Sequence, residues 1–142
     1  MIDRPALIAA LARFPDRLAA AARSAAARPP TPGEWTPEQV VRHLVAVEID
    51  VHQARLDDAA THDDPHWDWA EPGPWPGEPD LSLDGVLARF EALRRATLTT
   101  VGALDEAGWA RTGTHSTFGV FDVAALLDNA RTHDEEHLAG LV

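Results

Sequence analysis

The chain has 142 residues, the usual size of one domain, and a chain of this length can bury roughly two-thirds of the surface that it exposes when unfolded. Hydrophobic residues make up 45% of it and charged residues 25%, which excludes a disordered or fibrous protein and predicts a single globular domain over residues 1–142. The formal net charge of -11, from 23 acidic and 12 basic residues, repels phosphate groups, so we expect no nucleic-acid partner and no membrane partner.

The absence of cysteine restricts the chemistry of any functional site. Disulfide bonds, thiolate zinc sites and thiol nucleophiles are excluded, so nitrogen and oxygen atoms would have to hold any metal ion. The N-terminal residues show no basic segment followed by an apolar run and a cleavage site, and no stretch approaches the roughly 18 consecutive apolar residues of a membrane span. We therefore expect a cytoplasmic protein.

The first helical segment is expected over residues 3–27, where apolar residues recur at steps of three and four. Pro15 lies inside this segment, lacks a backbone N–H and crowds the preceding turn, so we expect it to kink or split the helix. The proline-rich tract at residues 28–33 then ends the segment.

The second helix has a well-marked start. Thr36 is expected to cap it, with Pro37 at the first helical position and Gln39 completing a capping box. The helix should end near residues 57–60. Residues 61–79 follow as a connection with five prolines and three tryptophans, which is far longer than the usual link between packed helices and permits a crossover or a lid.

Two further helices complete the expected architecture. The third begins near Ser82 and carries an apolar stripe to Leu104, before Gly108 and residues 112–119 break it. The fourth begins near Asp122 and runs to the C-terminus. No segment shows a sustained two-residue alternation bounded by hairpin turns. The sequence therefore predicts an all-α fold, in which four amphipathic helices form a four-helix bundle around one core.

Seven histidines include two pairs four residues apart, a spacing that is common by chance in a chain of this composition. In the pair His62 and His66, Pro65 prevents a helical geometry, so we reject this pair as a site. His133 and His137 lie within the fourth helix, where positions four apart stack on one face and two imidazoles can converge on one ion.

The histidines of the fourth helix take positions in its apolar stripe, and His43 lies at the edge of the apolar stripe of the second helix. Burying three unpaired imidazoles would cost roughly 1 to 3 kcal/mol each, a penalty that a shared metal ion removes. We therefore predict that His43, His133 and His137 hold one divalent metal ion. The alternative is that each is a core histidine bonded to a carbonyl or carboxylate group.

Three further residues are weaker candidates for a catalytic role. Asp50 lies seven residues after His43, and so on the same side of a regular helix. Glu136 is a nearby acid in the fourth helix, and His115, in a glycine-flanked loop, could reach the mouth of a site. A solvated surface position is the alternative for these residues. His52 is expected to point away from His43 by the same helical arithmetic.

Three neutral ligands, with no fourth protein ligand in the pattern, would leave the ion a position for water or substrate, as in catalytic centres. We therefore predict metal-activated nucleophile chemistry on a small-molecule substrate. Trp67, Trp69 and Trp75 in the long connection either cover the pocket or plug the end of the bundle. The competing hypothesis is a non-catalytic helical module for binding or dimerisation, with a structural or vestigial metal site.

Two stretches of the chain resemble a known family. Residues 35–48, WTPEQVVRHLVAVE, are similar to the second helix of the DinB-like (damage-inducible, YfiT-like) metalloproteins, and residues 118–138, FGVFDVAALLDNARTHDEEHL, are similar to their last helix. The resemblance spans nearly the whole chain in order and spacing. It implies an up-down-down-up bundle with a three-histidine site, often for zinc or nickel, whose ligands by position are His43, His133 and His137.

The family includes S-transferases and isomerases that use the thiols mycothiol or bacillithiol, as well as hydrolases, and homodimers are common in it. The resemblance therefore implies a metal-dependent transferase or hydrolase, with a low-molecular-weight thiol as a candidate co-substrate and a homodimer as the expected assembly. It identifies the metal site better than the substrate.

Overall fold

The computed structural model describes all of residues 1–142 and consists mainly of four long helical segments. They are α1 (Arg4–Ala26), the run of α2 (Pro37–Val47), the π-helical η1 (Glu48–Gln53) and α3 (Ala54–Thr61), then α4 (Leu83–Gly102) and α6 (Val123–Leu141). The smaller elements are the one-turn α5 (Glu106–Trp109) and the strands β1 (His66–Trp67), β2 (Thr112–His115) and β3 (Gly119–Asp122).

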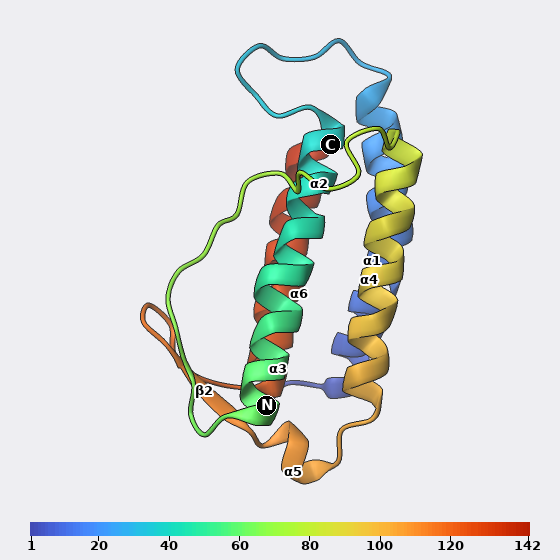
Figure 1. Cartoon of the computed structure of the whole chain (residues 1–142). Coiled ribbons are helices and arrows are strands. Elements are labelled where there is room, and N and C mark those ends of the chain that lie inside the picture. The colour runs from blue at the N-terminus through green and yellow to red at the C-terminus, as the bar shows by residue number, and fades with distance from the viewer.

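The helical segments run up, down, down and up along the bundle, as the family resemblance implies (Figure 1). The segment α2–α3 and α4 point the same way, so the chain must travel the length of the bundle between them. Residues 62–82 make this return along the outside of the bundle (Figure 1). The long connection predicted from the sequence is therefore a crossover.

The helices begin where the sequence predicts them. The Thr36 side chain accepts a hydrogen bond from the Gln39 N–H, and the Gln39 side chain accepts one from the Thr36 N–H, which forms the expected capping box. Ser82 and Asp122 cap α4 and α6 in the same manner, through hydrogen bonds from the backbone three residues further on. Local side-chain chemistry is sufficient to fix these starts.

Pro15 does not split the first helix, which was one of the two expected outcomes, because α1 is continuous from Arg4 to Ala26. The missing N–H of Pro15 leaves the carbonyl oxygen of Leu11, four residues earlier, without its helical donor. The guanidinium Nη1 of Arg94 on α4 donates to that oxygen at 3.1 Å. A side chain from a neighbouring helix thus replaces the hydrogen bond that proline removes.

A small three-stranded sheet at one end of the bundle was not predicted. Residues 112–119, expected only to separate the third and fourth helices, belong to the antiparallel hairpin β2–β3. Strand β1 pairs in parallel with β2 through His66 opposite Thr114 and Trp67 opposite His115. Strands of two to four residues are too short to show a two-residue hydrophobic alternation, which explains the omission. The sheet joins the crossover connection to the start of α6.

Apolar side chains form two clusters separated by a buried polar layer. The lower cluster includes Leu7 and Val101, and the upper cluster includes Phe14 and Phe90. Between them along the helices lie buried charged side chains, chiefly Arg94, which donates to Glu48 and Asp134.

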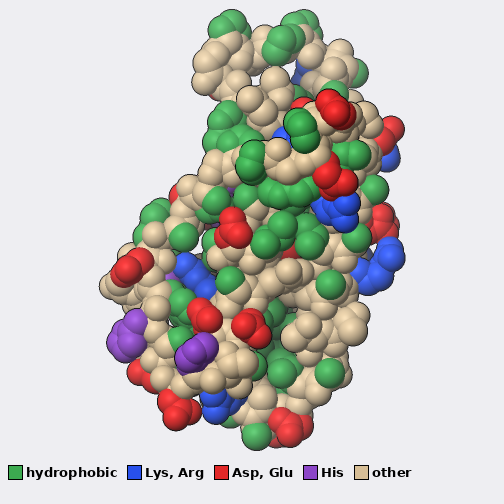
Figure 2. All heavy atoms as spheres, in the orientation of Figure 1, with side chains coloured by type: hydrophobic (Ala, Val, Ile, Leu, Met, Phe, Trp, Pro, Cys, Tyr) green, Lys and Arg blue, Asp and Glu red, His purple; other side chains and the backbone are tan.

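The surface carries many acidic side chains, which are scattered over the face shown in Figure 2 and do not gather in one patch. No helix combines the length and the apolar character needed to cross a membrane.

Candidate metal centre

Three imidazole rings from two helices meet at one point in the bundle. Nε2 of His137 lies 3.1 Å from Nε2 of His43 and 3.2 Å from Nε2 of His133. Ligand atoms at about 2.1 Å from a tetrahedral ion lie roughly 3.4 Å from one another, so this spacing suits a single small cation. His43 is fully buried, whereas the other two rings are partly exposed on one side. The structure thus brings together the three histidines that the sequence singled out.

A carboxylate completes the group, and the sequence analysis missed it. Oε1 of Glu71, on the crossover connection, lies 3.0 Å from Nε2 of His43, 3.6 Å from Nε2 of His133 and 3.9 Å from Nε2 of His137. These four side chains form a set that could hold a metal ion. The expectation that no fourth protein group lies near the histidines is therefore wrong, because a loop outside the helical pattern supplies one.

Hydrogen bonds on both sides hold Glu71 in place. Upstream, Arg55 donates to the carbonyl oxygen of Asp68 at 3.0 Å. Downstream, Nδ1 of His43 lies 2.6 Å from the carbonyl oxygen of Pro72, to which it can only donate. Further along, Arg42 donates to the carbonyl oxygens of Trp75, Gly77 and Glu78.

The contact with Pro72 also fixes the tautomer of His43. Its proton lies on Nδ1, so Nε2 presents a lone pair to the other histidines, as in metal-binding histidines oriented by a backbone carbonyl. The Nδ1 atom of His133 is buried and has no hydrogen-bond partner. Burial lowers the pKa of His133 and lowers that of His137 to about 4, so both rings are neutral near pH 7. Neutral imidazoles are the form that binds metal ions.

The π-helical segment η1 changes which residues of the continuous run α2–η1–α3 face the site. Its wider turns take more residues than α-helical turns, so side chains within and after it are rotated relative to a regular α-helix. Asp50, predicted to share a side with His43, is exposed to solvent. His52, predicted to point away, instead lies beside His133 with ring centroids 6.1 Å apart. Both differences follow from a change of helical period that the sequence pattern did not reveal.

A cavity of about 190 Å³ adjoins the histidines. Glu136 and His115 line it, and His115 is only 2% exposed, so the alternative of a solvated surface position is wrong for His115. Trp69 also lines this cavity, with its ring 5.9 Å from that of Phe118, whereas Trp67 packs in the lower apolar cluster. The tryptophans of the crossover connection therefore divide between covering the cavity and filling the bundle.

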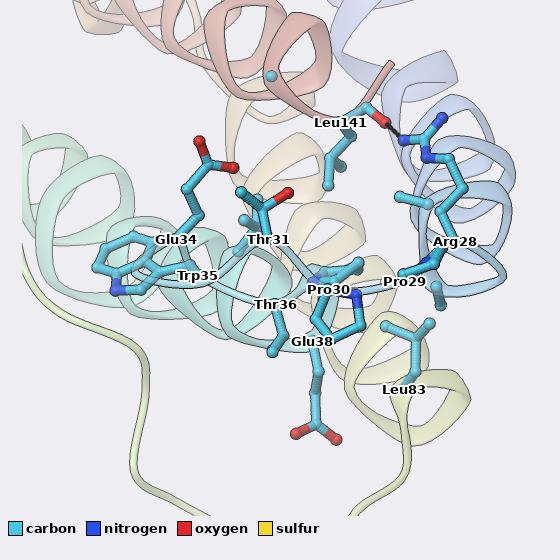
Figure 3. Close-up of a pocket in the computed structure, with 15 residues that line it drawn as sticks. Arg28, Pro29, Pro30, Thr31, Glu34, Trp35, Thr36, Glu38, Leu83 and Leu141 are labelled. Atoms are coloured by element: carbon cyan, nitrogen blue, oxygen red, sulfur yellow. Dashed lines mark hydrogen bonds between the residues drawn. The ribbon is translucent and has the colours of Figure 1, made fainter.

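A separate hollow of about 390 Å³ lies where the end of α1 meets the start of α2 and the end of α6. Figure 3 shows the Arg28 guanidinium reaching the carbonyl oxygen of Leu141 there, a hydrogen bond of 2.6 Å. Its wall includes proline, alanine and threonine residues and the acids Glu34 and Glu38, and it contains no histidine. It offers no set of groups for metal binding.

The chain is similar to known proteins in sequence pattern and in fold. The family model of the DinB superfamily matches residues 6–140. Among solved structures, YfiT from Bacillus subtilis, described as a probable metal-dependent hydrolase with an unusual four-helix bundle topology, is similar with a TM-score of 0.76 and 21% identity over 99% of this chain and 86% of YfiT. No curated protein sequence matches the chain. Because the family model covers nearly its whole length, the chain belongs to the DinB superfamily.

Proposed function

We propose that this protein is a metal-dependent enzyme in which His43, His133 and His137 hold one divalent ion, zinc or nickel, that activates water or a thiol. The observation that carries the proposal is the convergence of three imidazole nitrogens and one carboxylate oxygen within 4.8 Å of one another. Nitrogen lone pairs held this close repel one another unless a cation or a proton lies between them. Imidazole and carboxylate groups are also the ligand types that zinc and nickel accept.

The ion would supply a Lewis acid that lowers the pKa of a water molecule or a thiol to roughly 7. The protein's own groups provide the geometry. The Pro72 carbonyl oxygen orients the His43 ring, and the hydrogen bonds at Asp68 and Pro72 bring the Glu71 carboxylate to the same point. Glu71 is about half exposed, so it can accept a proton from a nucleophile that enters from the open side.

Hydrolysis is the first candidate reaction, in which the carboxylate beside the metal site takes the proton of an attacking water molecule. The description of YfiT as a probable metal-dependent hydrolase agrees with this choice. Transfer of a thiol such as mycothiol or bacillithiol is the second candidate. Glu71 could accept a thiol proton in the same way, and the partly exposed side of the site leaves a path for such a co-substrate.

Metal analysis tests the proposal. Protein purified without a histidine tag should contain close to one zinc or nickel ion per chain, and His43→Ala or His137→Ala should abolish binding. Glu71→Gln should retain the ion but weaken its affinity by roughly 10- to 100-fold or lower the turnover number. His66→Ala is the matched control, since His66 is exposed and is not one of the four side chains that converge at the site. A metal-free wild-type protein would favour the non-catalytic binding or dimerisation module.

Activity assays separate the two reactions. Hydrolysis of ester and amide substrates should proceed without added thiol, whereas a transferase should require mycothiol, bacillithiol or glutathione. The homodimer implied by the family resemblance can be tested in the same preparations by sedimentation equilibrium. A dimer has twice the 15.4 kDa mass of one chain, and a single-chain mass would contradict that prediction.

A further inference from the structure

Arg55 is a buried cation that no acidic side chain neutralises. The residue is only 8% exposed, and its single hydrogen bond within the protein goes from Nη2 to the carbonyl oxygen of Asp68. None of the ion pairs in the structure, with nitrogen and oxygen atoms within 4.0 Å, involves it. A guanidinium group has five N–H donors, so most of those of Arg55 have no acceptor in the protein.

The other two buried arginines, Arg94 and Arg42, have several hydrogen-bond acceptors within the protein. Arg94 directs its donors to the carboxylates of Glu48 and Asp134 and to the Leu11 carbonyl. Arg42 donates to three backbone carbonyl groups and lies 3.8 Å from Glu38. Arg55 therefore stands apart, and burial with no opposing acid lowers its pKa. A buried charge of this kind is expected to have an anionic partner.

The place of Arg55 indicates where that partner would lie. Arg55 lines the cavity of about 190 Å³ together with Glu71 and His133 of the metal centre. An anion bound by Arg55 would thus belong to a molecule that extends toward the histidines. The cavity is below the roughly 300 to 1,000 Å³ of typical sites for drug-sized ligands, which favours a compact molecule.

His115 supplies a second donor to the same cavity. Its Nδ1 atom accepts hydrogen bonds from the backbone N–H groups of Thr117 at 3.0 Å and Phe118 at 3.3 Å. In the neutral ring the proton must therefore lie on Nε2, which makes no hydrogen bond within the protein. Burial and the nearby charge of Arg55 lower the pKa of His115, so the ring stays a neutral donor near pH 7.

We propose that Arg55 and His115 form the anion-binding end of the substrate cavity and select a small molecule that carries one carboxylate group. This inference deepens the proposed function and rests on it for the reaction, but not for the binding of the anion. One guanidinium and one neutral N–H match a single negative charge and the two oxygens of a carboxylate. The carboxylates of Glu71 and Glu136, which line the same cavity, disfavour a doubly charged phosphate.

Binding of simple probes tests the assignment. Zinc-loaded, 15N-labelled protein is titrated with butyrate, with butyramide as the neutral analogue and with methyl phosphate as the dianion. NMR shifts of the arginine Nε–H signals and of the backbone amides of residues 115–118 report occupancy. We expect butyrate to bind at least about tenfold more tightly than butyramide. Tighter binding of methyl phosphate than of butyrate would overturn the choice of a carboxylate.

Variants of Arg55 and His115 test whether these two residues bind the butyrate carboxylate. Arg55→Gln should weaken butyrate binding by about tenfold or more, to the level of butyramide, and His115→Phe should weaken it by a smaller factor. Arg95→Gln is the matched control, because Arg95 is exposed and paired with Glu91, and it should leave binding unchanged. If Arg55→Gln does not fold, Arg55→Lys keeps the charge without the paired donors and should bind butyrate more weakly than wild type but more tightly than butyramide.

The metal-free His43→Ala variant separates this inference from the proposed function. Butyrate shifts that persist there and disappear in Arg55→Gln would support the anion site whether or not the protein binds metal. Equal binding of butyrate and butyramide by the wild type, or unchanged butyrate binding in Arg55→Gln, would overturn it. Loss of stability in Arg55→Gln with an unchanged preference for butyrate would show that Arg55 only anchors the loop through Asp68.

Discussion

Gly113 in β2 shows how a single residue keeps the small sheet attached to the bundle. The Trp67 ring lies directly over it, and a Cβ atom added at Gly113 would overlap the Cη2 and Cζ3 atoms of that ring. Trp67 also donates from Nε1 to Asp58 at 3.1 Å, and its ring is buried in the lower apolar cluster. Since the ring is held at both ends, it cannot move aside easily.

Replacement of Gly113 by alanine should therefore destabilise the protein. We expect Gly113→Ala to lower the free energy of unfolding by about 1 to 3 kcal/mol, as overpacking does in well-packed cores. Urea denaturation followed by circular dichroism measures the change. Gly140→Ala in α6 is the control, because no atom lies within 4 Å of the added Cβ and alanine favours the helix. Equal effects of the two substitutions would contradict the packing argument.

At the scale of elements, the buried polar layer joins all four helical segments. Arg94 on α4 bonds to Glu48 on η1, to Asp134 on α6 and to the carbonyl oxygen of Leu11 on α1. Thr97 adds a hydrogen bond of 2.9 Å to Glu48. The layer lies close to the histidines, because a ring nitrogen of His133 and a carboxylate oxygen of Asp134 are within 4.8 Å of each other. It therefore sets the relative positions of the two helices that carry the three histidines of the candidate metal centre.

The charge of Glu48 should make stability depend on pH. Burial alone would raise the pKa of Glu48, but the Arg94 charge and the hydrogen bonds from Arg94 and Thr97 together lower it below its ordinary value of 4.5. A carboxylate with a lowered pKa stabilises the fold fully above the unfolded value and loses that contribution as the pH falls through the folded value. Glu48→Gln should therefore cost about 1 to 3 kcal/mol at neutral pH and progressively less below about pH 4.5.

Urea unfolding of the wild type and of Glu48→Gln at several pH values tests whether the charge of Glu48 makes stability depend on pH. The difference in unfolding free energy should shrink as the pH falls from about 5 toward 3.5. A difference that stays constant down to the acid limit would show that Glu48 contributes through packing and not through its charge.

The first helix tolerates Pro15 because of its neighbour. A proline inside a helix ordinarily costs about 3 kcal/mol, partly through the lost hydrogen bond to the residue four positions earlier. Here the Leu11 carbonyl oxygen receives its hydrogen bond from Arg94 instead. We expect Pro15→Ala to stabilise the protein by well under about 3 kcal/mol. Chemical denaturation measures the gain.

A double-mutant cycle tests whether the Arg94 hydrogen bond to the Leu11 oxygen is what compensates for Pro15. In an Arg94→Met background the Leu11 oxygen has lost its side-chain donor, so Pro15→Ala should yield a larger gain than in the wild type. The same gain in both backgrounds would mean that the Arg94 contact does not compensate for the proline.

For the whole molecule, the metal centre would act as a cross-link. His43 comes from α2, His133 and His137 from α6, and Glu71 from the crossover connection. An ion that binds only the folded state stabilises it by about 2.7 kcal/mol when its free concentration is 100 times the dissociation constant. For a chain of this size that corresponds to a rise in Tm of roughly 10 °C.

Removal of metal should reverse this stabilisation. Treatment of zinc-loaded protein with EDTA should lower the Tm by roughly this amount, and added zinc should restore it. In calorimetry, His137→Ala should show the same Tm with and without zinc. A zinc-dependent rise in that variant as large as in the wild type would place the stabilising ion elsewhere.

The sequence by itself determined the features that depend on local chemistry. The capping box at Thr36 and the cap at Asp122 fix helix starts within a few residues, and helical periodicity turns His43, His133 and His137 inward. The length of the crossover connection also follows from its many prolines. These signals lie within one or two turns of the chain, so they can be read without knowledge of the fold.

Only the tertiary structure decided the contacts between distant segments. Glu71 reaches the histidines because backbone contacts hold its loop, and no periodic pattern marks a residue in such a loop. Arg55 and His115 come together through the crossover connection and the sheet, and the π-helical turn that moves His52 inward and Asp50 outward has no hydrophobic signature. These positions depend on packing between elements, whereas sequence periodicity reports only on the orientation of side chains within one element.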